Sequence, residues 1–249
     1  MGVLGEYPEN EMLAKLDVEI KKWNLIDPET PAIPALHYIA VTAQKNHGKD
    51  GKYRLRMPDT EIDKVIKIAE KINALVFLDI QIGQSTIQEE LPRLEKYLKM
   101  PQVHLAIDPE FFMKNKRLPG EYVGTYDATE KNYATNFLAQ LVKENNLTPK
   151  IFIIHRYTQN MLTNYKLIKI IPEVQIIIHM DGWGSEAVKK NTYKEYIYKE
   201  PIQFTGFKLF YKNDCQFLEI LYYYLANYLE RFLIKFDVNF FGDFRFILV

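Results

Sequence analysis

The sequence predicts an α/β protein with a TIM-like (β/α)8 barrel, and two patterns along its 249 residues support this fold. Apolar runs of strand length alternate with segments of helical periodicity, and each run is apolar at consecutive positions, which is typical of parallel strands covered on both faces. The runs before the C-terminal segment are residues 36–43, 74–80, 103–107, 122–126, 151–154, 174–180 and 204–211. With an eighth strand at 244–249, this repetition favours a closed barrel.

An open doubly wound sheet is the alternative fold. Such sheets usually carry a glycine-rich phosphate loop after the first strand, and residues 44–48 do not form one. No linker, repeat or composition break divides residues 1–214. We therefore expect a single barrel domain over residues 1–249, with an N-terminal helical segment at 1–30 and a divergent, aromatic-rich C-terminal segment at 215–249, where closure of the barrel is expected to be irregular.

Some polar residues have structural interpretations. Asp59 precedes a helical stripe of apolar residues, and Asp127 with Glu130 three positions later has the spacing of a capping box. We interpret both aspartates as helix caps. His104 lies early in its strand and is expected to be a buried histidine with its hydrogen bonds satisfied.

The composition excludes several function classes. Lys plus Arg and Asp plus Glu number 32 each, so the formal net charge is zero and no electrostatic case exists for nucleic acid or an anionic membrane. Cys215 is the single cysteine, which excludes an intramolecular disulfide.

The most apolar region, 217–234, contains charged residues, so we expect no membrane span. The first 23 residues mix charged and apolar positions and predict no signal peptide. The oligomeric state is left open.

Polar residues recur where the predicted strands end. In a barrel these ends meet at one rim, and residues two apart in a strand share a face. Carboxylates gathered on a partly desolvated rim push one another's pKa values apart, which separates acid and base roles. The predicted catalytic residues are Asp79, Asp108, Glu110 and Asp181, and the predicted substrate-binding residues are Gln81, His155, Arg156, His179, Trp183 and Lys208.

These residues favour a hydrolase that acts on a glycoside or cell-envelope carbohydrate through two carboxyls, with Glu110 as general acid and Asp181 or Asp79 as base or nucleophile. No cofactor is required by this mechanism. One alternative is a metal-dependent hydrolase in which a divalent ion is bound by His179, Asp181, His155 and Asp108. Another is a non-catalytic barrel that binds a carbohydrate or a protein partner. In each case the expected ligand is a small molecule, a carbohydrate or a partner, not nucleic acid.

Several of these motifs also resemble a known group of sequences. The segments MGVLGEYP at 1–8, PALH at 34–37, LDIQ at 78–81, LAIDPEF at 105–111 and IHMDG at 178–182 resemble an uncharacterised bacterial family of TIM-barrel-like proteins described as secreted, as lipoproteins or as hypothetical proteins. The resemblance covers about residues 1–214 and not the tail. It implies a TIM-barrel-like fold and an exported or lipid-anchored location, although this chain shows no export segment, and it implies no reaction.

Overall fold

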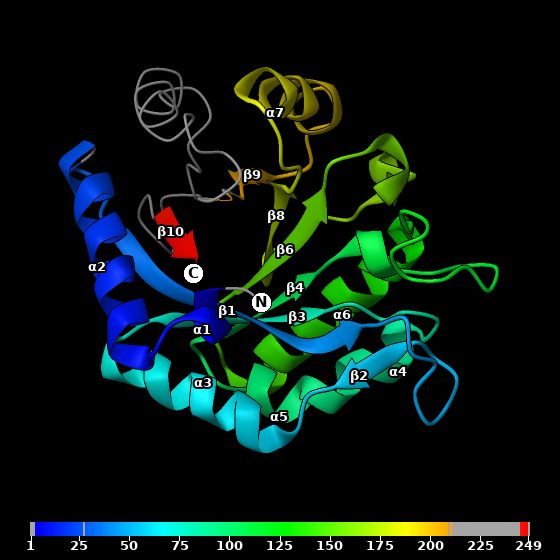
Figure 1. Ribbon diagram of the computed structural model, residues 1–249, viewed down its shortest axis with the longest axis horizontal. Coiled ribbons are helices and arrows are strands. Elements are labelled where there is room, and N and C mark those ends of the chain that lie inside the picture. Colours follow the sequence, from blue (N-terminus) through cyan, green and yellow to red (C-terminus); the bar gives the residue numbers. More distant parts are fainter. Residues whose placement is uncertain (1–2, 27, 209, 211–244, 249) are drawn as a thin grey trace.

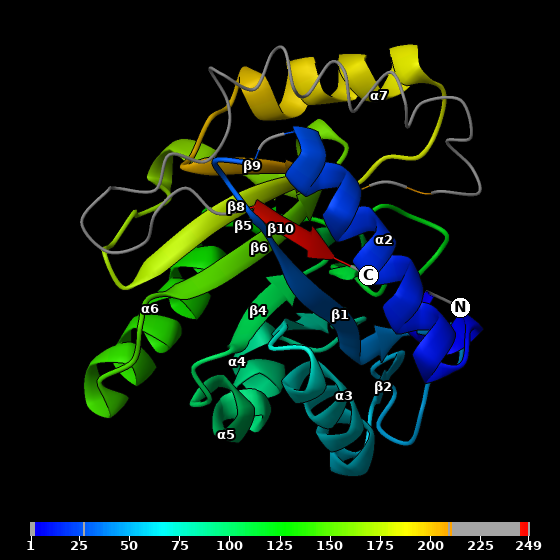
Figure 2. The same ribbon diagram turned by 90° about the vertical axis from the view of Figure 1, so that its left-hand side faces the viewer.

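The computed structural model describes residues 3–26, 28–208, 210 and 245–248, and its centre is one curled sheet (Figures 1 and 2). The strand order is β10-β1-β3-β4-β6-β8-β9, and every pair along this path is parallel. The short strand β2 pairs antiparallel with β1. The bounds are β1 Ala32–Ala43, β2 Arg54–Arg56, β3 Leu75–Ile80, β4 Val103–Ile107, β6 Lys150–Arg156, β8 Val174–Met180, β9 Phe204–Phe207 and β10 Arg245–Leu248.

The prediction of a closed (β/α)8 barrel is wrong. The sheet curls into a half-barrel, and among the described residues no hydrogen bond joins β9 to β10 at its two ends. On the outer edge of β1, β10 pairs with the first part of the strand and β2 with the last part. The expected eighth strand at 244–249 exists as β10, but it extends the sheet instead of closing it. The rest of the predicted aromatic-rich segment at 215–249 lies outside the described residues.

One predicted strand, residues 122–126, is not part of the curled sheet. Only Tyr126–Asp127 forms a strand, β5, which pairs with β7 (Leu162–Thr163) in a separate two-stranded sheet. Tyr122 and Val123 are largely exposed, and the Gly124 amide donates to the carbonyl of Glu110. The segment is therefore a loop folded over the end of β4, and β4 pairs directly with β6. The sheet therefore lacks the predicted strand at 122–126, which an eight-stranded barrel would need.

Helices cover the convex side of the sheet (Figures 1 and 2). The helix α3 shows why, since Ile62, Val65, Ile66 and Ala69 form the predicted apolar stripe and are all buried. Asp59 begins this helix, but Pro58 occupies the N-cap position, so the predicted cap by Asp59 is wrong. The bounds are α1 Val3–Glu6, α2 Glu9–Ile26, α3 Asp59–Lys71, α4 Ile87–Glu90, α5 Glu95–Leu98, α6 Ala128–Asn145 and α7 Glu186–Tyr193.

Short helical turns join these elements. They are η1 Leu91–Leu94, η2 Pro109–Phe111, η3 Gln159–Met161, η4 Tyr165–Leu167 and the π-helical turn η5 Lys194–Tyr198. At the start of α6, Asp127 accepts from the Thr129 amide while Glu130 accepts from the Asp127 amide, which confirms the predicted capping box. No helix among residues 3–26, 28–208, 210 and 245–248 is long and apolar enough to cross a membrane.

The sheet has an apolar core on each face because residues alternate across a strand. The larger core lies between the convex face and the helices and includes Leu36, Leu78 and Ile154. The smaller core lies on the concave face and consists of Ala35, Phe77, Ala106, Ile151, Ile153 and Ile177. Consecutive apolar positions in each strand thus serve two cores, as the sequence predicted. Because successive residues of a strand face opposite sides, every second residue of each strand faces the concave side.

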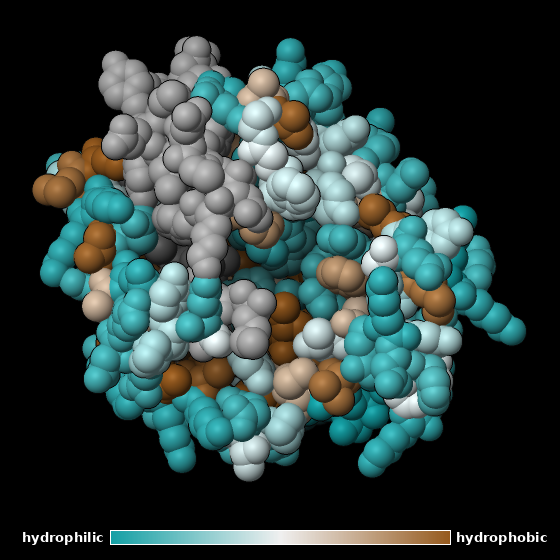
Figure 3. Space-filling model, in the orientation of Figure 1, coloured by the Kyte–Doolittle hydropathy of each residue, from teal (hydrophilic) through white to brown (hydrophobic). Residues whose placement is uncertain are grey.

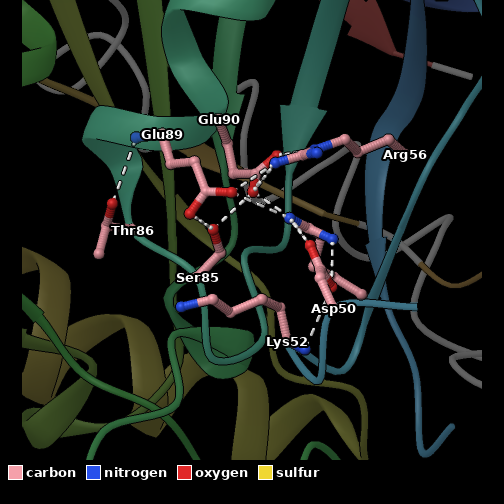
Figure 4. A network of polar contacts seen from close by, with 8 residues as sticks. Asp50, Lys52, Arg56, Ser85, Thr86, Glu89 and Glu90 are labelled. Atoms are coloured by element: carbon pink, nitrogen blue, oxygen red, sulfur yellow. Dashed lines mark hydrogen bonds and ion pairs between the residues drawn. The ribbon is translucent and has the colours of Figure 1, made fainter. Parts of the chain in front are cut away.

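A buried set of ion pairs, the Glu90 network, fastens β2 to α4 (Figure 4). The Glu90 carboxylate is 0% exposed and accepts from Arg54 at 2.8 Å, Arg56 at 2.7 Å and the Ser85 hydroxyl at 2.5 Å. Burial alone would raise the pKa of Glu90, but these hydrogen bonds outweigh it and lower the pKa. Asp50 and Glu89 complete the network at its exposed edge. The loop between β1 and β2 is thereby held beside the end of β3.

Candidate functional site

Polar side chains from six elements of the sheet gather at the carboxyl ends of its strands on the concave face. Each lies two or four positions after a residue of the concave core or, for Lys208, after Phe204, which packs against that core. The alternation of the strand therefore turns it to the same side; for example, Asp79 follows Phe77 and Asp108 follows Ala106. We call the set the strand-end cluster. It consists of His37, Asp79, Gln81, Asp108, His155, His179, Asp181 and Lys208.

Asp79 lies between two histidines. Its Oδ2 atom is 3.0 Å from His37 Nε2 and 3.8 Å from His155 Nε2. Burial alone would raise the pKa of Asp79, but the hydrogen bond with His37 and the nearby positive charges outweigh it and lower the pKa. Burial lowers the pKa of His37 despite the neighbouring carboxylate. The Asp79 carboxylate therefore has the neutral imidazole of His37 as its nearest partner.

Asp181 lies on the other side of His155. Its Oδ2 atom is 3.0 Å from His155 Nδ1, although the ring N–H is not aligned with that oxygen for a hydrogen bond. Lys208 Nζ lies 2.9 Å from both carboxylate oxygens of Asp181. Burial would raise the pKa of Asp181, but the charges of His155 and Lys208 outweigh it, so the pKa falls well below its usual range. Burial alone would lower the pKa of His155, but the charge of Asp181 outweighs burial and raises this pKa.

Asp108 and Glu110 differ from the other two carboxyls. Asp108 accepts from the Gln81 side chain at 3.2 Å and from the Glu110 amide at 3.1 Å, and burial raises its pKa to about 7. Burial also raises the pKa of Glu110, and the Asp181 charge adds to the effect. Beside Glu110, burial and the Glu110 charge raise the pKa of Tyr157. None of the ion pairs among the described residues includes Asp108 or Glu110.

The two remaining buried histidines have different surroundings. His104 Nδ1 accepts from the Ile151 amide at 3.2 Å, and burial lowers the pKa of His104 to about 3, which confirms its predicted structural role. The ring of His179 lies 5.2 Å from that of His155, and burial lowers the pKa of His179 to about 3. Gly206 on β9 lies close beside it, because a Cβ atom there would come within 2.9 Å of the His179 ring.

Most of the predicted site residues belong to the cluster, but Arg156 and Trp183 do not. Arg156 follows His155 in β6 and therefore points to the opposite face, where it donates to the carbonyls of Thr158, Gln159 and Tyr196 and pairs with Glu200 at 2.5 Å. It is fully buried and serves the fold. Trp183 is 69% exposed on the loop after β8. Glu110 lies at the edge of the cluster.

His37 is the member that sequence reasoning missed. It lies in the middle of β1, five residues after the strand begins at Ala32, where a site residue is not expected in a barrel. Its Cα pairs in register with Phe77, and the side chain reaches Asp79, two positions further along β3. The available signal was the histidine itself, whose imidazole stands in a largely apolar run.

His37, Asp79 and His155 form a group that could hold a metal ion, since each offers a ligand atom and these atoms all lie within 4.8 Å of one another. The set predicted from the sequence for a metal ion was His179, Asp181, His155 and Asp108, so the structure retains only His155 from it. On the face shown in Figure 3, the molecule is hollowed near its centre in front of β4, β6 and β8, and hydrophilic residues line the hollow.

Comparisons of the chain with protein-family models, with curated proteins and with solved structures find no match. The resemblance to a bacterial family therefore stays a prediction, and the case for a function rests on the geometry of the strand-end cluster.

Proposed function

We propose that the protein is a hydrolase that cleaves a glycoside or a related cell-envelope carbohydrate, with Asp108 and Glu110 as its proton-transferring groups. One observation carries the proposal: the cluster and its edge contain carboxyls of two kinds. Asp79 and Asp181 are paired with histidine or lysine, whereas Asp108 and Glu110 have no ion-pair partner among the described residues. The paired carboxylates hold neighbouring side chains, and the unpaired carboxyls are available for proton transfer.

The protonation of the unpaired carboxyls supports this division. A group transfers protons most effectively when its pKa lies near the working pH, and burial brings the pKa of Asp108 to about 7. The carboxyl of Glu110 is less buried than that of Asp108 and sits beside Tyr157, so it is the more accessible of the two to a substrate. We assign Glu110 as the proton donor to the leaving group and Asp108 as the base that activates water, which requires the two carboxyls on opposite sides of the scissile bond.

The carbohydrate part of the proposal rests on the aromatic surface around the cluster. Tyr157 follows β6 beside Glu110, and the exposed ring of Trp183 lies two residues after Asp181. Aromatic faces with polar neighbours suit sugar rings, whose C–H surfaces are apolar and whose hydroxyls hydrogen-bond. A substrate in the cell envelope also agrees with the exported location that the family resemblance implies.

The test is a hydrolysis assay of the full chain on panels of oligosaccharides, with peptides and esters as comparison substrates. We expect kcat/KM on the best glycoside to fall by about 100-fold or more in each of Asp108→Asn and Glu110→Gln, because a positioned acid or base contributes about that much. Asp127→Asn is the matched control, since it changes an aspartate at another strand end and asparagine also caps helices well. Its activity should match that of the parent chain.

Two outcomes would overturn the proposal. Hydrolysis of peptides or esters with no turnover of any glycoside would remove the carbohydrate assignment. Full activity in Asp108→Asn and Glu110→Gln, or carbohydrate binding without turnover in all variants, would remove the acid–base mechanism and favour a binding protein.

A further inference from the structure

We propose that His37, Asp79 and His155 bind one divalent transition-metal ion, with Asp181 as the residue that positions His155 from behind. The inference goes beyond the proposed hydrolase and does not depend on it, because metal binding is measured without any substrate. It rests on three observations: the spacing of the ligand atoms, buried polar atoms that lack partners, and the carboxylate on the far side of His155.

The spacing of the three ligand atoms fits a small ion. In a tetrahedral site with bonds of about 2.0 to 2.1 Å, the ligand atoms lie about 3.3 Å apart. The Asp79 Oδ2 atom is 3.0 Å from His37 Nε2 and 3.8 Å from His155 Nε2, so the two distances bracket that value. The three side chains come from the middle of β1 and from the carboxyl-terminal parts of β3 and β6, all on the concave face. All three ligand atoms lie within 4.8 Å of one another.

The buried polar atoms without partners point to a ligand. Asp79 Oδ1 and His155 Nε2 have no hydrogen-bond partner among the described residues, and their side chains are only 4% and 1% exposed. Buried polar atoms in folded proteins are almost always satisfied, since an unsatisfied one costs about 1 to 3 kcal/mol. A metal ion between the three side chains would bind the His155 lone pair and could also take the second oxygen of Asp79.

The surroundings of His155 resemble those of a metal-binding histidine, since a carboxylate lies close to its second ring nitrogen, although the N–H is not aligned for a hydrogen bond. Such a histidine usually presents its second ring nitrogen to a carboxylate, which fixes the tautomer and the orientation of the ring. Asp181 Oδ2 lies 3.0 Å from His155 Nδ1, and Lys208 holds Asp181 at 2.9 Å. With the ring proton on Nδ1, the Nε2 atom faces Asp79 as an unprotonated ligand.

The ligand set selects the type of ion. Two imidazoles and one carboxylate are typical of zinc and also suit manganese and iron(II), whereas calcium and magnesium prefer oxygen ligands alone. Three protein ligands leave at least one coordination position for water or substrate, as in catalytic zinc sites. The chemistry of such a position is the activation of water at neutral pH.

The test begins with purified full-length chain, produced without a histidine tag, stripped with chelator and dialysed. We expect isothermal titration with Zn²⁺ to show one tight site per chain, and elemental analysis after gel filtration to find about one zinc per chain. His37→Ala and His155→Ala should each weaken the binding by at least about 100-fold. Asp181→Asn should weaken it by about 10- to 100-fold, the usual effect of removing a carboxylate behind a ligand.

Two histidine variants serve as controls. His179→Ala removes a buried histidine whose ring lies 5.2 Å from that of His155 but which is outside the triad, and His47→Ala removes an exposed histidine that could bind zinc adventitiously. Both should keep one zinc per chain with unchanged affinity. If His37→Ala does not fold, His37→Gln replaces it, and circular dichroism of each stripped variant confirms that lost binding is not lost folding.

Absence of a tight site in the parent chain would overturn the inference, as would loss of zinc in His179→Ala or His47→Ala equal to that in His155→Ala. The hydrolase proposal can fail separately. One zinc per chain with undiminished hydrolysis in Asp108→Asn would retain the metal site and remove the proposed acid–base pair, and glycoside hydrolysis by a chain that binds no metal would do the reverse.

Discussion

Two clusters of buried charges lie at the same end of the sheet, and they differ in how completely their atoms are paired. In the Glu90 network, the Glu90 carboxylate accepts three hydrogen bonds, and no atom of the network is among the buried unpartnered atoms of the described residues. In the strand-end cluster, atoms of Asp79, His155 and His179 lack partners. Completely satisfied networks stabilise a fold, whereas unsatisfied buried atoms are tolerated where something must bind.

The two clusters also differ in the direction of their pKa shifts. The Glu90 network lowers the pKa of its buried carboxylate, because its arginines stabilise the charged form more than burial penalises it. In the strand-end cluster, Asp108 has no such partner, and burial raises its pKa to about 7. The pKa values of two buried carboxyls therefore shift in opposite directions, and the presence of a fixed cation beside the carboxyl decides the direction.

The largest effect on stability is expected from Glu90→Gln. Removing this charge leaves Arg54 buried without its main partner, so the free energy of unfolding should fall by about 3 to 5 kcal/mol in urea denaturation. Glu89→Gln is the matched control in the same network. Its side chain is 42% exposed, and exposed pairs contribute at most about 1 kcal/mol. Equal losses in the two variants would contradict the comparison.

A smaller effect of opposite sign is expected from Asp108→Asn, and it depends on pH. The native pKa of Asp108 is about 7 and the unfolded value about 3.9, so between these values the native state holds the extra proton. Stability of the parent chain should therefore fall as pH rises from about 4 to 7. The asparagine variant has no carboxyl to titrate at this position. Over that pH range its free energy of unfolding should therefore rise relative to the parent by on the order of a few kcal/mol.

The measurement for Asp108→Asn is urea denaturation at several pH values with chelator present. The chelator keeps both chains free of metal, so that the pH dependence reports the carboxyl. Asp127→Asn is the comparison, because the pKa of Asp127 is lowered instead of raised. A difference between parent and Asp108→Asn that stays constant from pH 4 to 8 would show that the Asp108 carboxyl is not held in its neutral form.

The smallest effect is expected from Asp127→Ala at the start of α6. Asp127 accepts from Thr129, Thr163 and Asn164, and losing this cap should cost about 1 kcal/mol near pH 7. Since its native pKa is lowered, the Asp127 contribution is present above pH 4 and is lost as pH falls further. Thermal denaturation at pH 7 and pH 2.5 should show a gap between the two chains that narrows in acid. Hydrolysis should be unaffected.

The alternation of residues along a strand predicted which face most of the candidate site residues share. It did not predict which of them pair with one another. The patterns around Asp79, Asp108 and Asp181 place each residue late in an apolar strand and on the same side as its i+2 neighbour, which depends only on the local geometry of a strand. The pairing of Asp79 with His37, and the absence of an ion pair at Asp108, depend on which strands are neighbours and in which register. Arg156 shows the limit, because adjacent residues in a strand face opposite sides.

The sequence by itself determined the alternation of strands and helices, the parallel two-sided core, the helix cap at Asp127 and the side of the sheet on which the carboxyls lie. These are local properties, set by hydrophobic periodicity and backbone geometry over a few residues. Tertiary structure alone decided that residues 122–126 form a loop, that β10 and β2 share the edge of β1, and that His37 joins Asp79 and His155. Those outcomes depend on contacts between segments that are distant in sequence. A local sequence pattern does not predict the free energies of such contacts.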